Sequence, residues 1–152
     1  MNKTAILTLI VLGAAFGLII WGNRQSGGEQ DITKICIQHQ NLRLHIHPRL
    51  KIIIKGQEQL IPANVGIASP SCFRPIHTHD GSGTLHIEFP KARDVRLGEF
   101  FLVWEKRFNS NQIFDYQNGA EGQLKMFVNG QENTEFENYI IKDLDEILII
   151  YE

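Results

Sequence analysis

A run of apolar residues near the N-terminus divides this 152-residue chain into two parts of different character. Ala5 to Trp21 holds seventeen residues without a charge, which is at the short end of what crosses a bilayer as a helix. Trp21 stands where an interfacial aromatic residue would stand, and Lys3 precedes the run. We therefore expect a single N-terminal transmembrane helix, with the N-terminus in the cytoplasm. The remaining part, about 130 residues, has the usual size of one domain.

A cleaved secretory signal is the alternative for the same run, because signal peptides also combine a basic start with an apolar stretch. The sequence shows no good small-x-small cleavage site after the run, which favours an uncleaved anchor. Under both interpretations the rest of the chain is exported. We expect an anchor at residues 1–21, a polar Gly-rich linker at 22–31, and an extracytoplasmic β-rich domain at 32–152, in the periplasm or at the cell surface.

Composition and charge exclude several classes of protein. With 43% hydrophobic and 21% charged residues, the chain is neither collagen-like nor disordered. Its net charge of −2 gives no basic excess to neutralise phosphates, so we expect no nucleic acid among its partners. The partners we expect are the membrane, through the N-terminal helix, and a larger membrane protein complex.

The two cysteines, Cys36 and Cys72, both lie in the exported part. An even number of cysteines outside the cytosol favours a disulfide, and closing this loop should stabilise the domain by roughly 3–4 kcal/mol. The alternative is a pair of metal-binding thiolates, although the spacing of the two residues matches no zinc or redox motif.

Two patterns predict an N-terminal β-hairpin region. Leu42 to His47 alternates apolar and polar side chains, which indicates a half-buried strand with His45 and His47 on one face. Lys51 to Lys55 is a β-branched run typical of a second strand, and the turn after it contains Gly56.

The clearest hairpin runs from Arg74 to Phe89, with turn residues at Asp80 to Gly83. A two-residue turn predicts the cross-strand pairs Ile76–Ile87, His77–His86, Thr78–Leu85 and His79–Thr84. One face of the hairpin then carries apolar side chains. The other face carries His77, His79, His86 and Glu88.

The remaining elements follow from periodicity and turn residues. Leu97 to Phe108 has apolar side chains at helical spacing, with Asp94 as a candidate N-cap. Leu124 to Val128 predicts a strand, and Asn129-Gly130 predicts a hairpin turn after it. Ile147 to Tyr151 is apolar throughout, so we expect it at the centre of a sheet.

The order hairpin, helix, strand, turn, strand predicts an α+β, mostly β fold: a β-grasp-like mixed sheet with one crossing helix, in residues 72–152. The last thirty residues, with their VNG turn, their acidic D-x-D-E-I segment and their final strand, resemble the ends of small β-grasp sulfur carriers. Those carriers finish in Gly-Gly, which is activated as an acyl adenylate, whereas this sequence ends Tyr151-Glu152. The resemblance therefore supports the fold, and we do not carry the conjugation chemistry over.

The stretch CFRPIHTHDGSGTLHIEFP, followed by LGEFFLVW, resembles an uncharacterised family of membrane-anchored bacterial and archaeal proteins. The shared motifs are H-T-H-D-x-[ST]-G-x-x-H-[IV]-E and L-G-x-F-F-x-V-W. In this chain they correspond to His77, Thr78, His79, Asp80, Ser82, Gly83, His86, Ile87 and Glu88, then Leu97, Gly98, Phe100, Phe101, Val103 and Trp104. The resemblance spans most of the exported part and implies a membrane-anchored protein, but no particular activity.

The histidines of the hairpin suit a metal ion. His77 and His79 stand two residues apart on a strand and point to one face, and His86 is opposite His77 with Cβ atoms roughly 5 Å apart. Three converging imidazoles of this kind suit a zinc or copper ion. The structural alternative is that these side chains simply occupy the solvated face of a strand.

Three further side chains extend the candidate site. Glu88 is next but one to His86 on the same face, where it would be a fourth ligand or would orient an imidazole. His45 and His47 would add to the ligands if their strand packs against the hairpin.

The sequence thus predicts a membrane-anchored extracytoplasmic domain that binds copper or zinc. The alternative is a non-catalytic accessory or interaction domain tethered next to a larger membrane complex. A metalloenzyme is a third hypothesis, because a three-histidine site leaves a coordination position open. The chain contains no P-loop, G-x-S-x-G or H-E-x-x-H motif, and we expect a protein without catalytic activity.

Overall fold

A computed structural model describes residues 31–152 of the chain. The predicted anchor at 1–21 and all but the last residue of the predicted linker lie outside the described residues. Between residues 31 and 152, no helix is long and apolar enough to cross a membrane.

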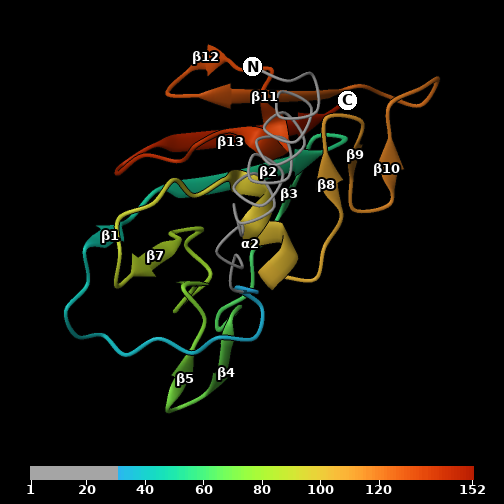
Figure 1. Cartoon of the computed structure of the whole chain (residues 1–152). Coiled ribbons are helices and arrows are strands. Elements are labelled where there is room, and N and C mark those ends of the chain that lie inside the picture. The colour runs from blue at the N-terminus through green and yellow to red at the C-terminus, as the bar shows by residue number, and fades with distance from the viewer. Residues whose placement is uncertain (1–30) are drawn as a thin grey trace, which may run out of the picture. The chain divides into compact units, whose positions relative to one another are not determined.

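The largest sheet has five strands, in the order β12-β11-β13-β2-β3, and occupies the upper half of Figure 1. β13 pairs with β2 in parallel, and every other pair in this sheet is antiparallel. The predicted mixed sheet and the central position of the last strand are therefore confirmed. The strands are β2 (Arg49–Ile54), β3 (Gln57–Gln59), β11 (Leu124–Val128), β12 (Gln131–Glu132) and β13 (Glu146–Tyr151).

Alternation along the three central strands builds one apolar face. Ile149 is the neighbour of Ile52 on one side and of Met126 on the other, and all three side chains are fully buried. Burying one side chain of this size contributes about 1.5–3 kcal/mol, so the row across β11, β13 and β2 fixes the register of the sheet.

Both hairpins of this sheet turn through two residues with left-handed backbone. Asn129 and Gly130 have φ angles of 52° and 79° between the paired residues Val128 and Gln131. This geometry matches the right-handed twist of the flanking strands, and it confirms the predicted Asn-Gly turn. In the first hairpin the turn residues are Lys55 and Gly56.

A second sheet of three short strands carries the predicted histidine hairpin. Its order is β1-β7-β6, with β1 (Leu44–Ile46), β6 (Ile76–His77) and β7 (His86–Phe89). The hairpin at 74–89 is thus separate from the five-stranded sheet, which takes its first two strands from residues 49–59 instead. The N-terminal region also divides between the sheets, because β1 pairs with β7 and β2 pairs with β13 and β3.

The hairpin register is confirmed for two pairs, Ile76–Ile87 and His77–His86. The pairs Thr78–Leu85 and His79–Thr84 are wrong, because the two arms separate after His77. The Thr78 N–H donates to the Val65 carbonyl at 3.0 Å, and the Leu85 N–H donates to the Pro48 carbonyl at 2.9 Å. Each arm finds a backbone partner in a segment far away in the sequence.

Helix α2 (Leu97–Val103) ends earlier than the predicted range Leu97–Phe108. Glu105 has a left-handed backbone with φ of 58°, and the Lys106 N–H donates to the Phe101 carbonyl at 2.9 Å. This pattern is a Schellman motif, in which a residue with left-handed backbone closes the helix. Glycine is common at that position, and because the chain has glutamate there, the sequence pattern did not reveal the helix end.

Arg96, not the predicted Asp94, precedes the first turn of α2. The Arg96 N–H donates to a carboxylate oxygen of Glu99 at 2.9 Å, and the same carboxylate accepts two hydrogen bonds from Arg93. A carboxylate in the first helical turn is favourable because it satisfies free N–H groups and faces the positive end of the helix dipole. Glu99 therefore has the role that the sequence assigned to Asp94.

Short elements complete the described residues. Two of them, β4 and β5, form a two-stranded sheet, and β8, β9 and β10 form a three-stranded one. Leu97, Phe100 and Phe101 of α2 are buried in the same apolar cluster as the five-stranded sheet. The remaining bounds are β4 (Ile67–Ser69), β5 (Cys72–Phe73), β8 (Phe108–Asn109), β9 (Gln112–Ile113), β10 (Tyr116–Gln117) and the 3₁₀ helix η1 (Phe136–Asn138).

Candidate metal centre

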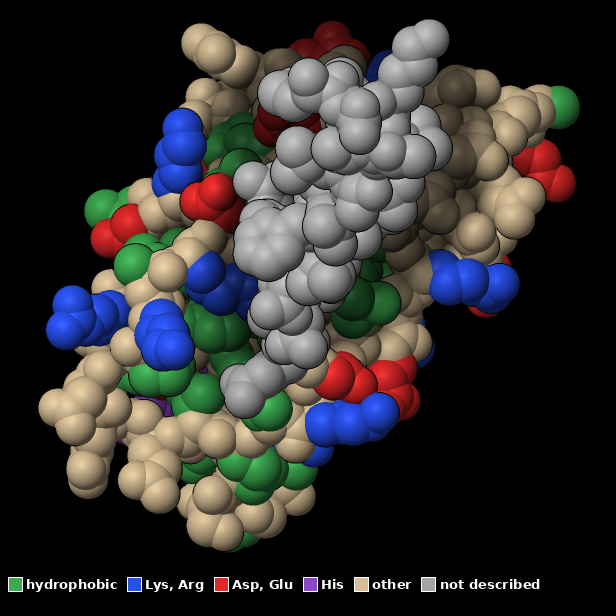
Figure 2. Space-filling model, viewed as in Figure 1, with side chains coloured by type: hydrophobic (Ala, Val, Ile, Leu, Met, Phe, Trp, Pro, Cys, Tyr) green, Lys and Arg blue, Asp and Glu red, His purple; other side chains and the backbone are tan. Residues whose placement is uncertain are grey.

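All six histidines of the chain gather at the small sheet. The centroids of neighbouring imidazole rings are between 4.5 and 5.7 Å apart. On the face shown in Figure 2, histidine is visible as a small purple area at the lower left. The six come from three segments: the loop before β1 (His39), β1 and the residue after Ile46 (His45, His47), and the β6–β7 hairpin (His77, His79, His86).

The hairpin brings His77, His79 and His86 together, as the sequence predicted. Cross-strand pairing stacks the rings of His77 and His86, with centroids 5.4 Å apart and planes at 17°. The His79 ring is 4.9 Å from that of His77 and 4.5 Å from that of His86. Each of the three offers a ring nitrogen within 4.8 Å of the other two. We call these residues the hairpin triad.

His77 is the most deeply buried of the cluster, with no exposed surface. Its Nδ1 lies 3.0 Å from the Arg74 carbonyl oxygen, which can only accept, so Nδ1 carries the proton and Nε2 carries the lone pair. Nε2 is buried and has no hydrogen-bond partner among residues 31–152. A buried nitrogen without a partner costs about 1–3 kcal/mol, which is a reason to look for a ligand.

Burial lowers the pKa of His77 to about 4, with further lowering by His79 and His86, against the raising effects of the Arg74 carbonyl and Glu88. His77 is therefore neutral at pH 7. Burial also lowers the pKa of His86, and its other neighbours His79 and His47 act in the same direction. Neutral imidazole is the form that binds metal ions, because only it has a free lone pair.

Glu88 is 3% exposed and connects two histidines that lie outside the hairpin. One carboxylate oxygen is 2.6 Å from Nδ1 of His39, and the other is 3.2 Å from Nε2 of His45, which is its direct partner across β1 and β7. Glu88 therefore orients these two imidazoles, one of the two roles that the sequence allowed. A ligand role also fits the geometry, since a Glu88 oxygen, His39 and His77 offer atoms within 4.8 Å of one another.

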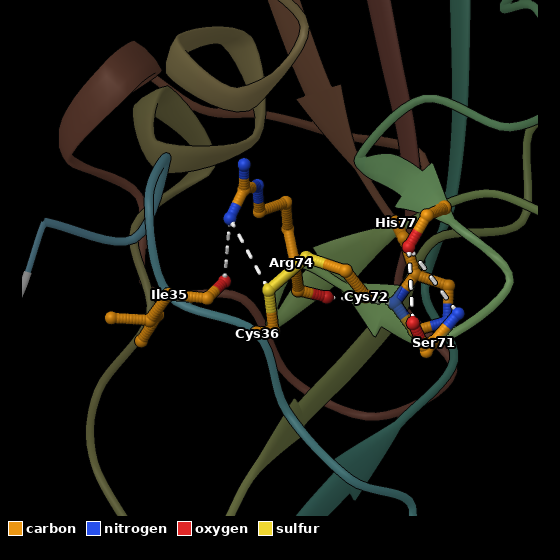
Figure 3. Close-up of a disulfide and its surroundings, with 7 residues drawn as sticks. Ile35, Cys36, Ser71, Cys72, Arg74 and His77 are labelled. Atoms are coloured by element: carbon orange, nitrogen blue, oxygen red, sulfur yellow. Dashed lines mark hydrogen bonds between the residues drawn. A yellow bond between two sulfur atoms is a disulfide. The ribbon is translucent and has the colours of Figure 1, made fainter.

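The predicted disulfide between Cys36 and Cys72 is present, so metal-binding thiolates are excluded. Figure 3 shows the Arg74 side chain lying over this disulfide, where its guanidinium donates to the Ile35 carbonyl at 3.1 Å. The Ile37 N–H also donates to the Phe73 carbonyl at 2.8 Å. These bonds fasten residues 35–37 beside β5, at the edge of the histidine cluster.

His39 is the member of the cluster that sequence reasoning missed. Its ring lies 4.6 Å from that of Phe73 and 5.7 Å from that of His77. The usable signal was its position three residues after Cys36, since a disulfide to Cys72 necessarily brings this segment close to the hairpin.

His45 and His47 form a second group around His86. The two rings are 4.6 Å apart, and the His47 ring is 4.8 Å from that of His86. Each of the three offers a ring nitrogen within 4.8 Å of the others. The condition under which these two histidines would join the site, contact of their strand with the hairpin, is met by the β1–β7 pair. We call His45, His47 and His86 the β1 triad.

Searches against protein-family models, curated proteins and solved structures found no match to this chain. The function is therefore argued from the geometry and chemistry of the histidine cluster.

Proposed function

We propose that this chain is a membrane-anchored, extracytoplasmic domain that binds one copper or zinc ion through the hairpin triad. The observation that carries the proposal is His77, whose Nδ1 is held by the Arg74 carbonyl while its Nε2 is buried without a partner among the described residues. Metal-binding histidines characteristically donate the other ring N–H to a carbonyl or carboxylate, which fixes the tautomer and the ring orientation. The Arg74 carbonyl would have this role for His77.

The donor set suits the proposed metals. Three imidazole nitrogens that can approach one point match the ligand preference of zinc and copper, and they leave a coordination position for water or a further ligand. Glu88 and the β1 triad supply candidates for that position. We propose a role in holding, delivering or sensing the ion, without catalysis.

The extracytoplasmic location is part of the proposal, and the disulfide supports it. Disulfides such as Cys36–Cys72 persist in oxidising compartments and are rare in the cytosol. The apolar run at Ala5 to Trp21 would be the anchor, with the N-terminus in the cytoplasm.

We further infer that the five-stranded sheet is a β-grasp arrangement. Two features support this inference: the parallel central pair β2–β13, and the α-helix α2, which lies along the chain between the hairpin β2–β3 and the hairpin β11–β12. The histidine cluster would then sit on an additional three-stranded sheet, with β1 before the first hairpin and β6 and β7 between that hairpin and the helix.

The test is a metal titration of the full-length chain in detergent, purified without a histidine tag. We expect one tight equivalent of Zn(II) or Cu(II) by native mass spectrometry, lost when His77, His79 and His86 are all replaced by alanine and kept in Glu132→Ala, a matched control whose residue is exposed on β12. Absence of stoichiometric binding by the wild-type chain would overturn the proposal.

The alternative function, a non-catalytic accessory domain beside a larger membrane complex, is favoured by exposed apolar side chains. Leu60 is 75% exposed and lines a hollow of about 470 Å³ in which Trp104, Phe114 and Tyr116 lie among the charged residues Glu105, Lys106, Arg107 and Asp115. Co-purification from membranes would distinguish the two functions. The accessory role predicts a membrane protein partner that is lost in Leu60→Asp, with no binding of metal.

A further inference from the structure

We propose that the β1 triad is a second site for the same class of ion. The two triads share His86, and a single ion occupies one triad or the other. This inference rests on the proposed function, because it concerns the route by which the ion enters or leaves the hairpin triad. An ion would move between the two sites by exchanging ligands around His86, without being released to solvent.

The first support is the continuity of the imidazoles. Ring contacts run from His45 to His47 at 4.6 Å, from His47 to His86 at 4.8 Å, and from His86 to His79 at 4.5 Å. His86 is the one residue common to both triads. Each step along this series replaces one nitrogen ligand with a neighbouring one while the others remain close.

The second support is that groups other than the ligands fix the β1 triad in place. The carboxylate of Glu88, itself 3% exposed, holds His45 at 3.2 Å. The His47 backbone N–H donates to a carboxylate oxygen of Asp143 at 2.9 Å, from the turn that precedes β13. The first contact orients the His45 imidazole, and the second fixes the backbone of His47, whose ring lies 4.8 Å from that of His86.

The two triads differ in access to solvent. In the β1 triad the side chain of His45 is 48% exposed and no member is fully buried, whereas the hairpin triad combines the exposed His79 with the completely buried His77. An incoming ion, or a ligand from an acceptor protein, can therefore reach the β1 triad at His45 and the hairpin triad at His79, but not at His77. The buried Nε2 of His77 favours the hairpin triad as the resting position.

Sharing His86 allows an ion in only one of the two triads at a time. A neutral imidazole has one lone pair and serves one ion at a time. Simultaneous occupation of both triads would require His86 to lose its remaining proton. We therefore expect one equivalent in the wild-type chain, although the two triads together contain five histidines.

The experiment separates the two triads by single substitutions in the full-length chain in detergent. His79→Ala removes a ligand of the hairpin triad only, His47→Ala removes a ligand of the β1 triad only, and His86→Asn removes a ligand of both. Zn(II) stoichiometry and affinity are measured by native mass spectrometry. The Cu(II) complexes are compared by electron paramagnetic resonance, and circular dichroism verifies that each variant is folded.

We expect one equivalent in the wild-type chain and one in each of His79→Ala and His47→Ala, with different Cu(II) spectra for the two variants. The double variant His47→Ala/His79→Ala and His86→Asn should each bind at least about 100-fold more weakly than either single variant. Loss of a contact that only supports a ligand lowers metal affinity roughly 10–100-fold. Loss of a direct ligand should therefore lower the affinity by at least about 100-fold.

Two results would overturn the inference while the proposed function stands. One is a wild-type chain that binds an ion while folded His79→Ala binds none, since the hairpin triad would then act alone. The other is a second equivalent in the wild-type chain that folded His79→Ala loses while it keeps the first, which would show that both triads hold an ion at once. A wild-type chain that binds no ion would instead overturn the proposed function itself.

Discussion

His77 uses its two ring nitrogens in opposite ways, since one is bonded to a carbonyl of its own loop and the other is buried without a partner among residues 31–152. The proton on Nδ1 cannot leave without breaking the bond to Arg74, and a proton added at Nε2 would be buried charge. The ring is thereby kept in a single tautomer, and its free lone pair is available for an ion at neutral pH.

A pH dependence of stability follows for the metal-free protein. The pKa of His77 is about 4 when folded, against an ordinary value of 6.5. Between pH 6.5 and pH 4, His77 is protonated in the unfolded chain and neutral in the folded chain. The free energy of unfolding should therefore be level above pH 6.5 and fall as the pH drops towards 4, by about 3 kcal/mol at most from this residue.

Urea titrations between about pH 7.5 and 4, a range that brackets both protonation states, would measure this loss. The groups that face His77 are His39, His79, His86 and Glu88, and His86 has a lowered pKa that acts in the same direction. The slope should therefore become shallower, without disappearing, in His77→Asn. An unchanged slope in that variant would show that other groups cause the dependence.

Glu88 provides a second prediction at the scale of single residues. Glu88→Gln keeps the size of the side chain but weakens its hold on His39 and His45. We expect the affinity for Zn(II) to fall roughly 10–100-fold when the His79→Ala substitution is also present, because only the β1 triad then remains. The loss should be smaller in the otherwise wild-type chain. If Glu88→Gln leaves the affinity of His79→Ala for Zn(II) unchanged, Glu88 does not orient the β1 triad. Glu132→Gln on β12 is the matched control.

Among the elements, the loop between β6 and β7 carries the contact that joins the small sheet to the large one. Gly83 has φ of +82°, and its carbonyl accepts the Leu50 N–H at 2.9 Å. A Cβ atom at this position would lie 2.4 Å from the Leu50 carbonyl oxygen. Only glycine combines this backbone conformation with this close approach.

We therefore expect Gly83→Ala to lower the free energy of unfolding by at least about 2 kcal/mol, through backbone strain and a direct clash with β2. Gly56→Ala is the matched control, since Gly56 has a similar φ of +78° but nothing within 4 Å of its Cβ position. It should cost about 1 kcal/mol. Chemical denaturation measures both values, and equal losses would mean that the contact with Leu50 adds nothing.

The elements that could be predicted from the sequence are those with local causes. Alternation and turn residues located β2, β11, β13 and the first two pairs of the histidine hairpin. The separation of the hairpin arms could not be predicted, because it depends on backbone bonds to Pro48 and Val65. The early end of α2 was also missed, since Glu105 takes a conformation for which glycine is the usual signal.

In the candidate site, too, the sequence could predict the contacts with local causes and missed the others. The hairpin triad follows from a period of two and a short turn, both of which are visible in the sequence. His39 depends on the disulfide, and the contact of His45 with Glu88 depends on β1 joining β7 instead of β2. Non-local pairing thus decided how many histidines meet, whereas local pattern decided which three form the hairpin triad.

At the scale of the whole described domain, one apolar core supports both sheets. Ile76, Leu85 and Ile87 of the small sheet and its connecting loop are fully buried in the same cluster as Ile52 and Met126 of the large one. The histidines occupy the opposite side of strands whose apolar side is fixed in this core. A scaffold of this kind holds ligands in place before the ion arrives, which reduces the cost of ordering them on binding.

The gathering of every histidine of the chain in one cluster has a spectroscopic consequence. In most proteins imidazole proton resonances report on scattered positions and must be assigned before they can be interpreted. Here every imidazole resonance arises from one cluster, in which neighbouring rings lie 4.5 to 5.7 Å apart, so all the histidine signals of a proton NMR spectrum report on the same site. Binding of an ion to the cluster would therefore change these signals visibly, even before any of them had been assigned.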